Sequence, residues 1–408
     1  MRTQFVIFLC GFTSGFSLLI SGNTLNFWLS SESIDIRIIG IFSLISLPYA
    51  INFIWAPLLD SAAIPLFHRL FGQRLSWVYF LQTLLAISVY LLSLCDPATS
   101  LGLLALCAFF VSFFSSTMDA AIGALRSEVV EPSKHGAVAG GYIFGYRVGM
   151  LLASSGAIFC SELTSWQNIY QIFAIIILSF PFILNISLPK IFAKKIHNIE
   201  VTGGNFLLKI LRSLGSTKSI VILLVFLVLY RLPDNFINVM INPFLLHIGF
   251  DAGEIATVGK FLGILAAILG GFIASHIMRK TSVLDSLLYF GIAHALAHIM
   301  FIAQNAAGHN LPLLFLVMGF ESITGGMAMA AYIAFITSMC SGKYSATQYA
   351  ILSSMMGLSR SILPGLSGFI VSAYGWQEFY LFTAVATVPA IVLLWWMKRG
   401  FKNHLYHF

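Results

Sequence analysis

Long apolar runs separated by short polar breaks make up most of the chain. The runs lie at 5–29, 37–58, 77–95, 101–125, 136–160, 169–188, 218–246, 253–278, 283–304, 311–340, 348–374 and 378–397. A helix needs about 20 apolar residues to cross the hydrocarbon core of a bilayer, and most of these runs reach that length. The pattern therefore predicts an all-helical membrane protein with twelve spanning helices.

The composition excludes other classes of protein. Of the 408 residues, 59% are hydrophobic and 9% are charged, with a mean hydropathy of +0.92. An ordinary soluble domain carries about 25% charged residues. This deficit excludes soluble and disordered proteins, and it excludes a nucleic-acid binder despite the net charge of +7. The lipid bilayer is the expected surrounding, and no nucleic-acid partner is expected.

The basic residues predict an orientation. Nearly all Lys and Arg residues outside the apolar runs lie at the N-terminus, in loops after even-numbered helices, or at the C-terminus. Arg37 is the exception, in the first loop of the other side. Cytoplasmic loops carry the excess of Lys and Arg, so both termini are expected in the cytoplasm.

A repeat divides the predicted helices into two groups of six. Trp166, Gln167 and Tyr170 recur 210 residues later as Trp376, Gln377 and Tyr380, each set between the fifth and sixth helix of its half. A basic segment, 189–217, separates an N-terminal bundle (1–188) from a C-terminal bundle (218–408). This duplicated plan resembles the major facilitator fold, in which two pseudo-symmetric six-helix bundles surround a solute site.

Charged residues inside the apolar runs indicate a solute pathway. A charge at bilayer depth costs about 2.5–3.5 kcal/mol and marks a cavity or a partner. In a facilitator-type fold, helices 1, 4, 7 and 10 line the cavity and helices 2, 5, 8 and 11 flank it. The buried charges lie on helices of these two groups: Asp119, Arg147, Arg231, Asp234, Lys260, Glu321 and Arg360, with Arg126 near the inner end of helix 4. The alternative is that some of them only hold helices together, as Asp119 with Arg147 would.

Helix 7 and helix 1 carry uncharged polar candidates. Arg231, Asn235, Asn238 and Asn242 follow i, i+4, i+7 and i+11 spacing, which predicts one polar stripe facing water or substrate. On helix 1, Asn23 and Asn26 with Trp28 suit a sugar, and an interfacial anchor is the alternative for Trp28.

Histidine and glycine patterns give two further hypotheses. His294 and His298 have a spacing that suits a metal, but no third ligand is evident and helix 9 is expected at the periphery. No metal or other cofactor is therefore expected. Small residues repeat every fourth position along helices 5 and 8, predicting close packing between the two bundles that would let them rock: Gly141, Gly145 and Gly149, and Gly259, Gly263, Ala267 and Gly271. The alternative is ordinary tight packing without special mobility.

Several stretches together resemble the AmpG family of muropeptide permeases. They include SGNTLNFWL (21–29), MDAAIGALRSEVV (118–130), GYRVGML (145–151), LYRLPDNF (229–236), GFDAGEIATVGKFLGILAAILGG (249–271) and ESITGGMAMAAYIAFITSMC (321–340). The resemblance covers nearly the whole chain. It implies a bacterial inner-membrane secondary transporter, not an enzyme, that imports GlcNAc-anhydroMurNAc and its peptides by proton symport and alternating access.

The resemblance also implies roles for particular residues. Asp119, Arg126, Arg147, Arg231, Asp234, Lys260 and Glu321 occupy matching motif positions. Asp60 and Arg74 match gating positions in the loop between helices 2 and 3, where Ser61, Gln73 and Leu75 depart from the family pattern.

The charges suit an anionic glycopeptide. The deep cations Arg147, Arg231, Lys260 and Arg360 outnumber the acids Asp119, Asp234 and Glu321, and arginine suits paired contacts with carboxylates. We expect Asp119 or Glu321, rather than Asp234, to couple transport to protons. A monomer is expected. The alternatives are the same fold carrying another large anion, such as an acyl-CoA or a nucleotide-like solute, or a sensor that does not transport. A membrane transferase is disfavoured because no metal-binding aspartate motif occurs.

Overall fold

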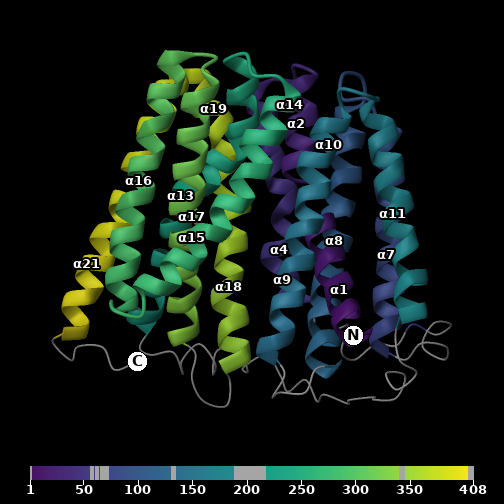
Figure 1. Cartoon of the computed structure of the whole chain (residues 1–408), viewed down its shortest axis with the longest axis horizontal. Coiled ribbons are helices and arrows are strands. Elements are labelled where there is room, and N and C mark those ends of the chain that lie inside the picture. The colour runs from purple at the N-terminus through teal and green to yellow at the C-terminus, as the bar shows by residue number, and fades with distance from the viewer. Residues whose placement is uncertain are drawn as a thin grey trace. The chain divides into compact units, whose positions relative to one another are not determined.

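The protein is all-helical throughout the part of the chain that the structure describes. A computed structural model describes residues 2–55, 73–129, 135–187, 217–339 and 345–402, with positions 59 and 64. Figure 1 shows that long helices make up both halves of the chain. The first half comprises α1 (Arg2–Ile20), α2 (Asn23–Ser31), α3 (Ile36–Ile41), η1 (Phe42–Ser46), α4 (Leu47–Ile51), η2 (Asn52–Ile54), α7 (Gln73–Ser93), α8 (Leu101–Val129), α9 (His135–Leu151), η4 (Leu152–Gly156), α10 (Ala157–Cys160) and α11 (Trp166–Ser187).

The second half repeats this organisation. It comprises α13 (Thr217–His247), α14 (Ala252–Glu254), η6 (Ile255–Leu262), α15 (Gly263–Ile277), α16 (Val283–Ala307), α17 (Leu311–Met339), α18 (Ser345–Ser361), η8 (Leu363–Leu366), α19 (Ser367–Tyr374), α20 (Trp376–Val385) and α21 (Val388–Lys402). Within the described residues, each of the twelve predicted spans coincides with one helix or with consecutive helical segments. The predicted all-helical membrane fold is confirmed.

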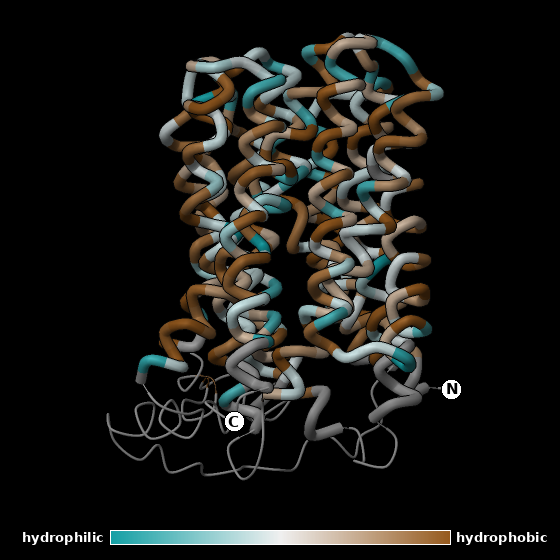
Figure 2. Tube along the Cα trace, turned by 90° about the vertical axis from the view of Figure 1, so that its left-hand side faces the viewer, coloured by the Kyte–Doolittle hydropathy of each residue, from teal (hydrophilic) through white to brown (hydrophobic). Residues whose placement is uncertain are grey.

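Ten helical stretches within the described residues are long and apolar enough to cross a membrane. The predicted spans 37–58 and 348–374 are absent from these ten. The first is a shorter apolar helical stretch, Ile36–Ile51, and the second is divided into α18, η8 and α19. Pro364, in the first turn of η8, has no backbone N–H to continue the hydrogen bonds of α18, which accounts for the second break. Figure 2 shows apolar residues distributed along the helical shafts.

The described residues form two compact units. The first contains those within 1–34 and 45–201, and the second contains those within 35–44 and 202–408. The expected linker 189–217 lies outside the described residues except for Thr217. Residues 35–44 pack in the second unit, where α3 lies against α19. A Cβ on Gly368 would lie 2.0 Å from the Ile36 carbonyl oxygen, so only glycine allows this approach.

Glycine seams hold helices together inside each unit. In the first unit, a Cβ on Gly145 of α9 would lie 2.1 Å from the Phe8 carbonyl oxygen of α1. In the second unit, a Cβ on Gly326 of α17 would lie 2.2 Å from the Ala267 carbonyl oxygen of α15. In both cases the partner backbone belongs to the same unit, as ordinary tight packing requires. Packing of these seams between the two bundles stays a prediction.

The Trp–Tyr repeat has the same packing role in both units. Trp166 and Tyr170 of α11 contact Trp28 of α2, with ring centroids 6.0 and 5.2 Å apart. Trp376 and Tyr380 of α20 contact Phe244 of α13 at 5.2 and 4.9 Å. In each unit the start of the sixth span therefore packs on aromatic residues of the first span.

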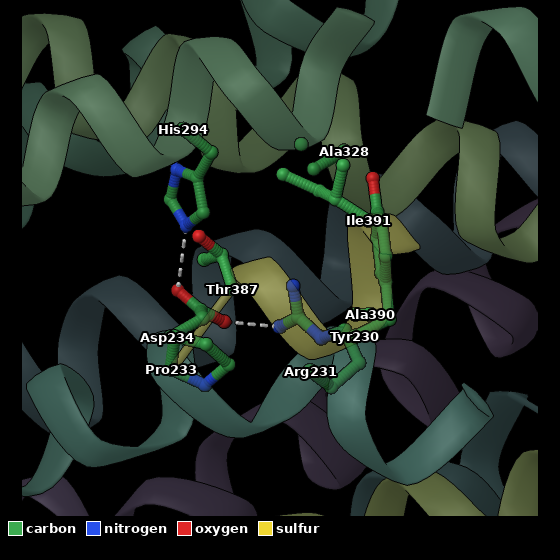
Figure 3. A pocket seen from close by; sticks show the side chains of 10 residues that line it. Tyr230, Arg231, Pro233, Asp234, His294, Ala328, Thr387, Ala390 and Ile391 are labelled. Atoms are coloured by element: carbon green, nitrogen blue, oxygen red, sulfur yellow. Dashed lines mark hydrogen bonds and ion pairs between the residues drawn. The ribbon is translucent and has the colours of Figure 1, made fainter. Parts of the chain in front are cut away.

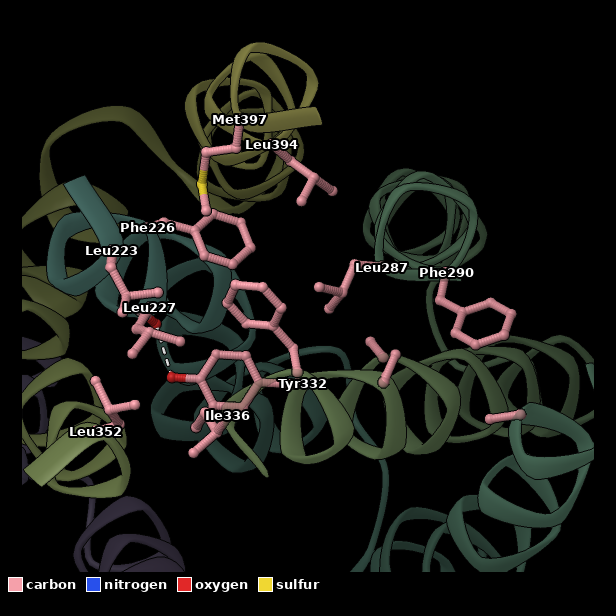
Figure 4. Packing of buried hydrophobic residues seen from close by; sticks show 14 of the residues in the cluster. Leu223, Phe226, Leu227, Leu287, Phe290, Tyr332, Ile336, Leu352, Leu394 and Met397 are labelled. Atoms are coloured by element: carbon pink, nitrogen blue, oxygen red, sulfur yellow. Dashed lines mark hydrogen bonds between the residues drawn. The ribbon is translucent and has the colours of Figure 1, made fainter. Parts of the chain in front are cut away.

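A buried apolar cluster lies in the second unit. Figure 4 shows Phe226 and Leu227 of α13 facing Tyr332 of α17, with Leu394 of α21 nearby. The Tyr332 hydroxyl donates to the Leu227 carbonyl at 3.0 Å. Tyrosine can be buried here because its polar end has a partner. This cluster fixes α13 and α17, the two helices that carry the charged residues described next.

Candidate functional site

Arg231 and Asp234 form an ion pair one turn apart on α13. Their side chains are 14% and 9% exposed, and the Arg231 guanidinium contacts Asp234 Oδ2. Spacing of i, i+3 places both side chains on one face of the helix. Burying either charge alone would cost several kcal/mol, so each group requires the other in this position.

Two further helices, α16 and α17, bring titratable groups to this pair. His294 of α16 lies with Nε2 3.4 Å from Asp234 Oδ1 and Nδ1 3.1 Å from Thr324 Oγ1 of α17. One oxygen of Glu321 on α17 completes a group in which the ligand atoms of Asp234, His294 and Glu321 lie within 4.8 Å of one another. Figure 3 shows Arg231, Asp234 and His294 connected in a row beside a small cavity, which is also lined by Tyr230, Gly291 and Thr387.

The donor set would also suit a transition metal, since histidine and carboxylates bind Zn²⁺. The guanidinium of Arg231 already occupies Asp234 Oδ2. A divalent ion at this position would therefore meet a fixed positive charge.

The polar stripe predicted on helix 7 does not face one environment. Asn235 is 5% exposed and donates to Ser359 Oγ of α18 at 3.0 Å, while Asn242 is fully buried. Asn238 is exposed and donates to the Asp234 carbonyl at 2.9 Å. Helical spacing put these residues on one side of α13, but α18 packs against part of that side. In this conformation Asn238 is the exposed member of the stripe.

In the first unit, the predicted residues are partly accessible. Asp119 of α8 and Arg147 of α9 are half-buried. Asn23 is half-buried and accepts from Ser154 Oγ at 3.4 Å. Trp28 has no exposed surface and stacks on Trp166. The hypotheses that Trp28 stacks on a sugar or anchors the chain at the interface were therefore wrong, because its ring is enclosed by protein.

The remaining predicted residues are less fully described. Arg360 of α18 is half-buried. Arg74 lies in α7, Arg126 in α8 and Lys260 in η6, and their side chains lie outside the described part of the structure. Asp60 also lies outside it. The predicted gating pair Asp60 and Arg74 therefore stays a prediction.

Sequence reasoning set aside the histidine that completes the cluster. His294 was noted for its spacing with His298, but its helix was expected at the periphery of the bundle. The structure brings His294 to Asp234 on helix 7. The available signal was the polarity of the residue itself, since two histidines one turn apart in an apolar helix need buried partners.

Comparisons with known proteins agree with this fold. A family model described as Major Facilitator Superfamily matches residues 5–303 and 232–404. A transporter named AmpG 1 from Rickettsia bellii is 50% identical over 408 residues, covering 98% of this chain and 100% of the relative. An anhydromuropeptide permease of Escherichia coli is 31% identical, covering 95% of this chain and 78% of that protein. The nucleoside transporter NupG has the same fold, with a TM-score of 0.75 at 16% identity and coverage of 97% and 99%.

These relatives define a multi-pass membrane transporter, not an enzyme. The chain belongs to the Major Facilitator Superfamily and, within it, to the AmpG family of transporters. The family resemblance inferred from the sequence motifs is thereby confirmed.

Proposed function

We propose that the chain imports anhydromuropeptides, GlcNAc-anhydroMurNAc and its peptides, across the bacterial inner membrane. The observation that carries this proposal is the 31% identity to an anhydromuropeptide permease over 95% of this chain. Transport proceeds by alternating access and is driven by proton symport. The protein works as a monomer.

The charges at membrane depth support an anionic substrate. Arg147 is half-buried in α9, and no ion pair of its guanidinium is present among the described residues. A guanidinium at this depth needs an anionic partner, and a carboxylate of the substrate peptide fits it bidentately. Arg126, Arg231, Lys260 and Arg360 contribute further positive charge, and Asn23 and Asn238 are the proposed sugar-binding amides, since Asn235 and Asn242 are buried. Of these, the exposed Asn238 is available in the conformation described here.

The test is uptake of radiolabelled GlcNAc-anhydroMurNAc-tripeptide into proteoliposomes, with and without an inward proton gradient. We expect accumulation above the external concentration only with the gradient. Neutral N-acetylglucosamine is the control for the charge requirement. Uptake of an acyl-CoA or a nucleotide instead of the glycopeptide would favour the alternative solutes. No movement of any of these solutes by folded protein would favour a sensor.

A further inference from the structure

His294 lies in contact with Asp234 (Figure 3), and the polar neighbours of its ring show which of the two ring nitrogens carries the hydrogen. Each ring nitrogen of His294 has one polar neighbour: Nε2 faces Asp234 Oδ1 at 3.4 Å and Nδ1 faces Thr324 Oγ1 at 3.1 Å. A neutral imidazole has one N–H, so one nitrogen donates and the other presents a lone pair. The neighbours decide which nitrogen carries the hydrogen.

Thr324 assigns the hydrogen to Nδ1. Its hydroxyl oxygen lies 2.8 Å from the Phe320 carbonyl oxygen and 3.0 Å from the Glu321 carbonyl oxygen, and both of these groups only accept. Threonine inside a helix commonly donates to the carbonyl one turn back. With its single hydrogen used there, the hydroxyl oxygen accepts from His294, and Nδ1 must be the donor.

Nε2 of a neutral His294 would then direct a lone pair at a carboxylate oxygen. Both groups are buried, with 7% and 9% of their side chains exposed, so water does not separate their charges well. A proton on Nε2 converts this repulsion into a charge-assisted hydrogen bond between imidazolium and carboxylate. The arrangement is therefore satisfied when the ring carries two protons.

The position of Arg231 fits the same state, because its guanidinium contacts Asp234 Oδ2 and leaves Oδ1 to face His294. The groups that face His294 are Tyr230, Arg231 and Asp234 from α13, His298 from α16 and Glu321 from α17, with Tyr380 of α20 close to Glu321. The cavity lining contributed by α21 and the turn before it is uncharged: Thr387, Ala390 and Ile391.

We propose that Asp234, His294 and Glu321 form the binding site for the transported proton, with His294 carrying it as an imidazolium. This inference rests on the proposed proton-coupled transport and names the residues that perform it. The proton passes from water to Nε2 and later returns to water, and no other bond changes. When it leaves, the Nε2 lone pair faces Asp234, so the contact between α13 and α16 weakens and Arg231 remains as the partner of Asp234.

The proton can be observed without any substrate. Protein labelled with ¹⁵N-histidine and reconstituted in lipid bilayers is titrated from pH 5 to 9 by solid-state NMR, and the His294 signals are assigned as those missing in His294→Gln. We expect both nitrogens protonated at low pH and only Nε2 to lose its proton as pH rises. The exposed His276→Gln variant is the control and should leave these signals unchanged.

Thr324 provides a variant that keeps the histidine. Thr324→Val removes the acceptor of the Nδ1 hydrogen, so a neutral ring can carry its hydrogen on Nε2 and donate to Asp234; the imidazolium signal should fall. Thr324→Ser restores it. A neutral ring with hydrogen on Nε2 over the whole pH range of the wild-type protein would overturn the proposal.

Transport gives the second readout. In proteoliposomes, His294→Gln should lose at least tenfold of the gradient-driven accumulation of GlcNAc-anhydroMurNAc but retain exchange of labelled for unlabelled solute. Undiminished accumulation in this variant would overturn the proposal. If the wild-type protein moves no GlcNAc-anhydroMurNAc, the proposed function fails, and the NMR titration still decides whether the proton site exists.

Discussion

Gly145 of α9 lies so close to Phe8 of α1 that a Cβ at position 145 would be 2.1 Å from the Phe8 carbonyl oxygen. We expect Gly145→Ala to force α1 and α9 apart, because the clashing atom belongs to the backbone. Overpacking of this kind costs about 1–3 kcal/mol and at times more. The measurement is the melting temperature in detergent. Gly123→Ala is the matched control, since nothing lies within 4 Å of a Cβ there.

Asn238 and Asn235 lie in different environments on α13, so we expect one substitution to affect substrate binding and the other to affect stability. Asn238→Ala should raise the KM for GlcNAc-anhydroMurNAc several-fold at unchanged melting temperature, because Asn238 is exposed. Asn235→Ala leaves the buried Ser359 hydroxyl without one of its partners and should cost about 1–3 kcal/mol of stability. Equal effects of both substitutions on KM, with no loss of stability in either, would show that the two amides share one environment.

Arg147 is expected to bind a substrate carboxylate. Hydrogen bonds to charged groups contribute about 1.5–3 kcal/mol, and every 1.4 kcal/mol is tenfold in affinity. Arg147→Gln should therefore weaken binding of the tripeptide derivative by roughly ten- to a hundredfold. Arg147→Lys should recover only part of this, because an ammonium cannot form the paired contact. Equal affinity of the wild-type protein and Arg147→Gln would remove this residue from the site.

The ion pair between Asp35 and Arg37 at the start of α3 should not contribute to the pH dependence of transport in the range of the assays. Asp35 accepts hydrogen bonds from the side chain and the backbone N–H of Arg37, which lowers the pKa of Asp35 from 3.8 to about 2. A lowered pKa gives a contribution that is present above pH 3.8 and lost as pH falls toward 2. Asp35→Asn should therefore leave the shape of the uptake profile between pH 5 and 8 unchanged. A shifted profile would place a coupling group at this position.

The all-helical membrane fold could be predicted from the sequence because each helix that crosses a bilayer needs a run of about 20 apolar residues. The apolar runs predicted the helical stretches of the described residues, and Pro364 lies where α18 ends and η8 begins. Deep charges such as Arg231 and Asp234 were identifiable because hydrocarbon makes them costly. Periodicity alone places residues on a helix face and does not say which neighbour covers it. For that reason the sequence predicted that Asn235 faces water or substrate, whereas in the structure its side chain donates to the Ser359 hydroxyl.

Periodicity also could not show which residues His294 and the seam glycines contact. Their positions in the sequence were evident, but their partners lie on helices far away in the chain. Whether Gly145 meets α1 or the other unit depends on tertiary packing, and so does the contact of His294 with Asp234. That Asp234 and Glu321 both lie near one histidine likewise depends on the packing of α13, α16 and α17.

The most direct test of the whole account is accumulation of radiolabelled GlcNAc-anhydroMurNAc-tripeptide by purified protein in proteoliposomes under an imposed proton gradient. We expect uptake against the solute gradient that stops when a protonophore collapses the proton gradient, while solute exchange continues. Uptake that is indifferent to the protonophore would contradict proton coupling. The absence of uptake and exchange by folded protein would contradict the assignment of the substrate.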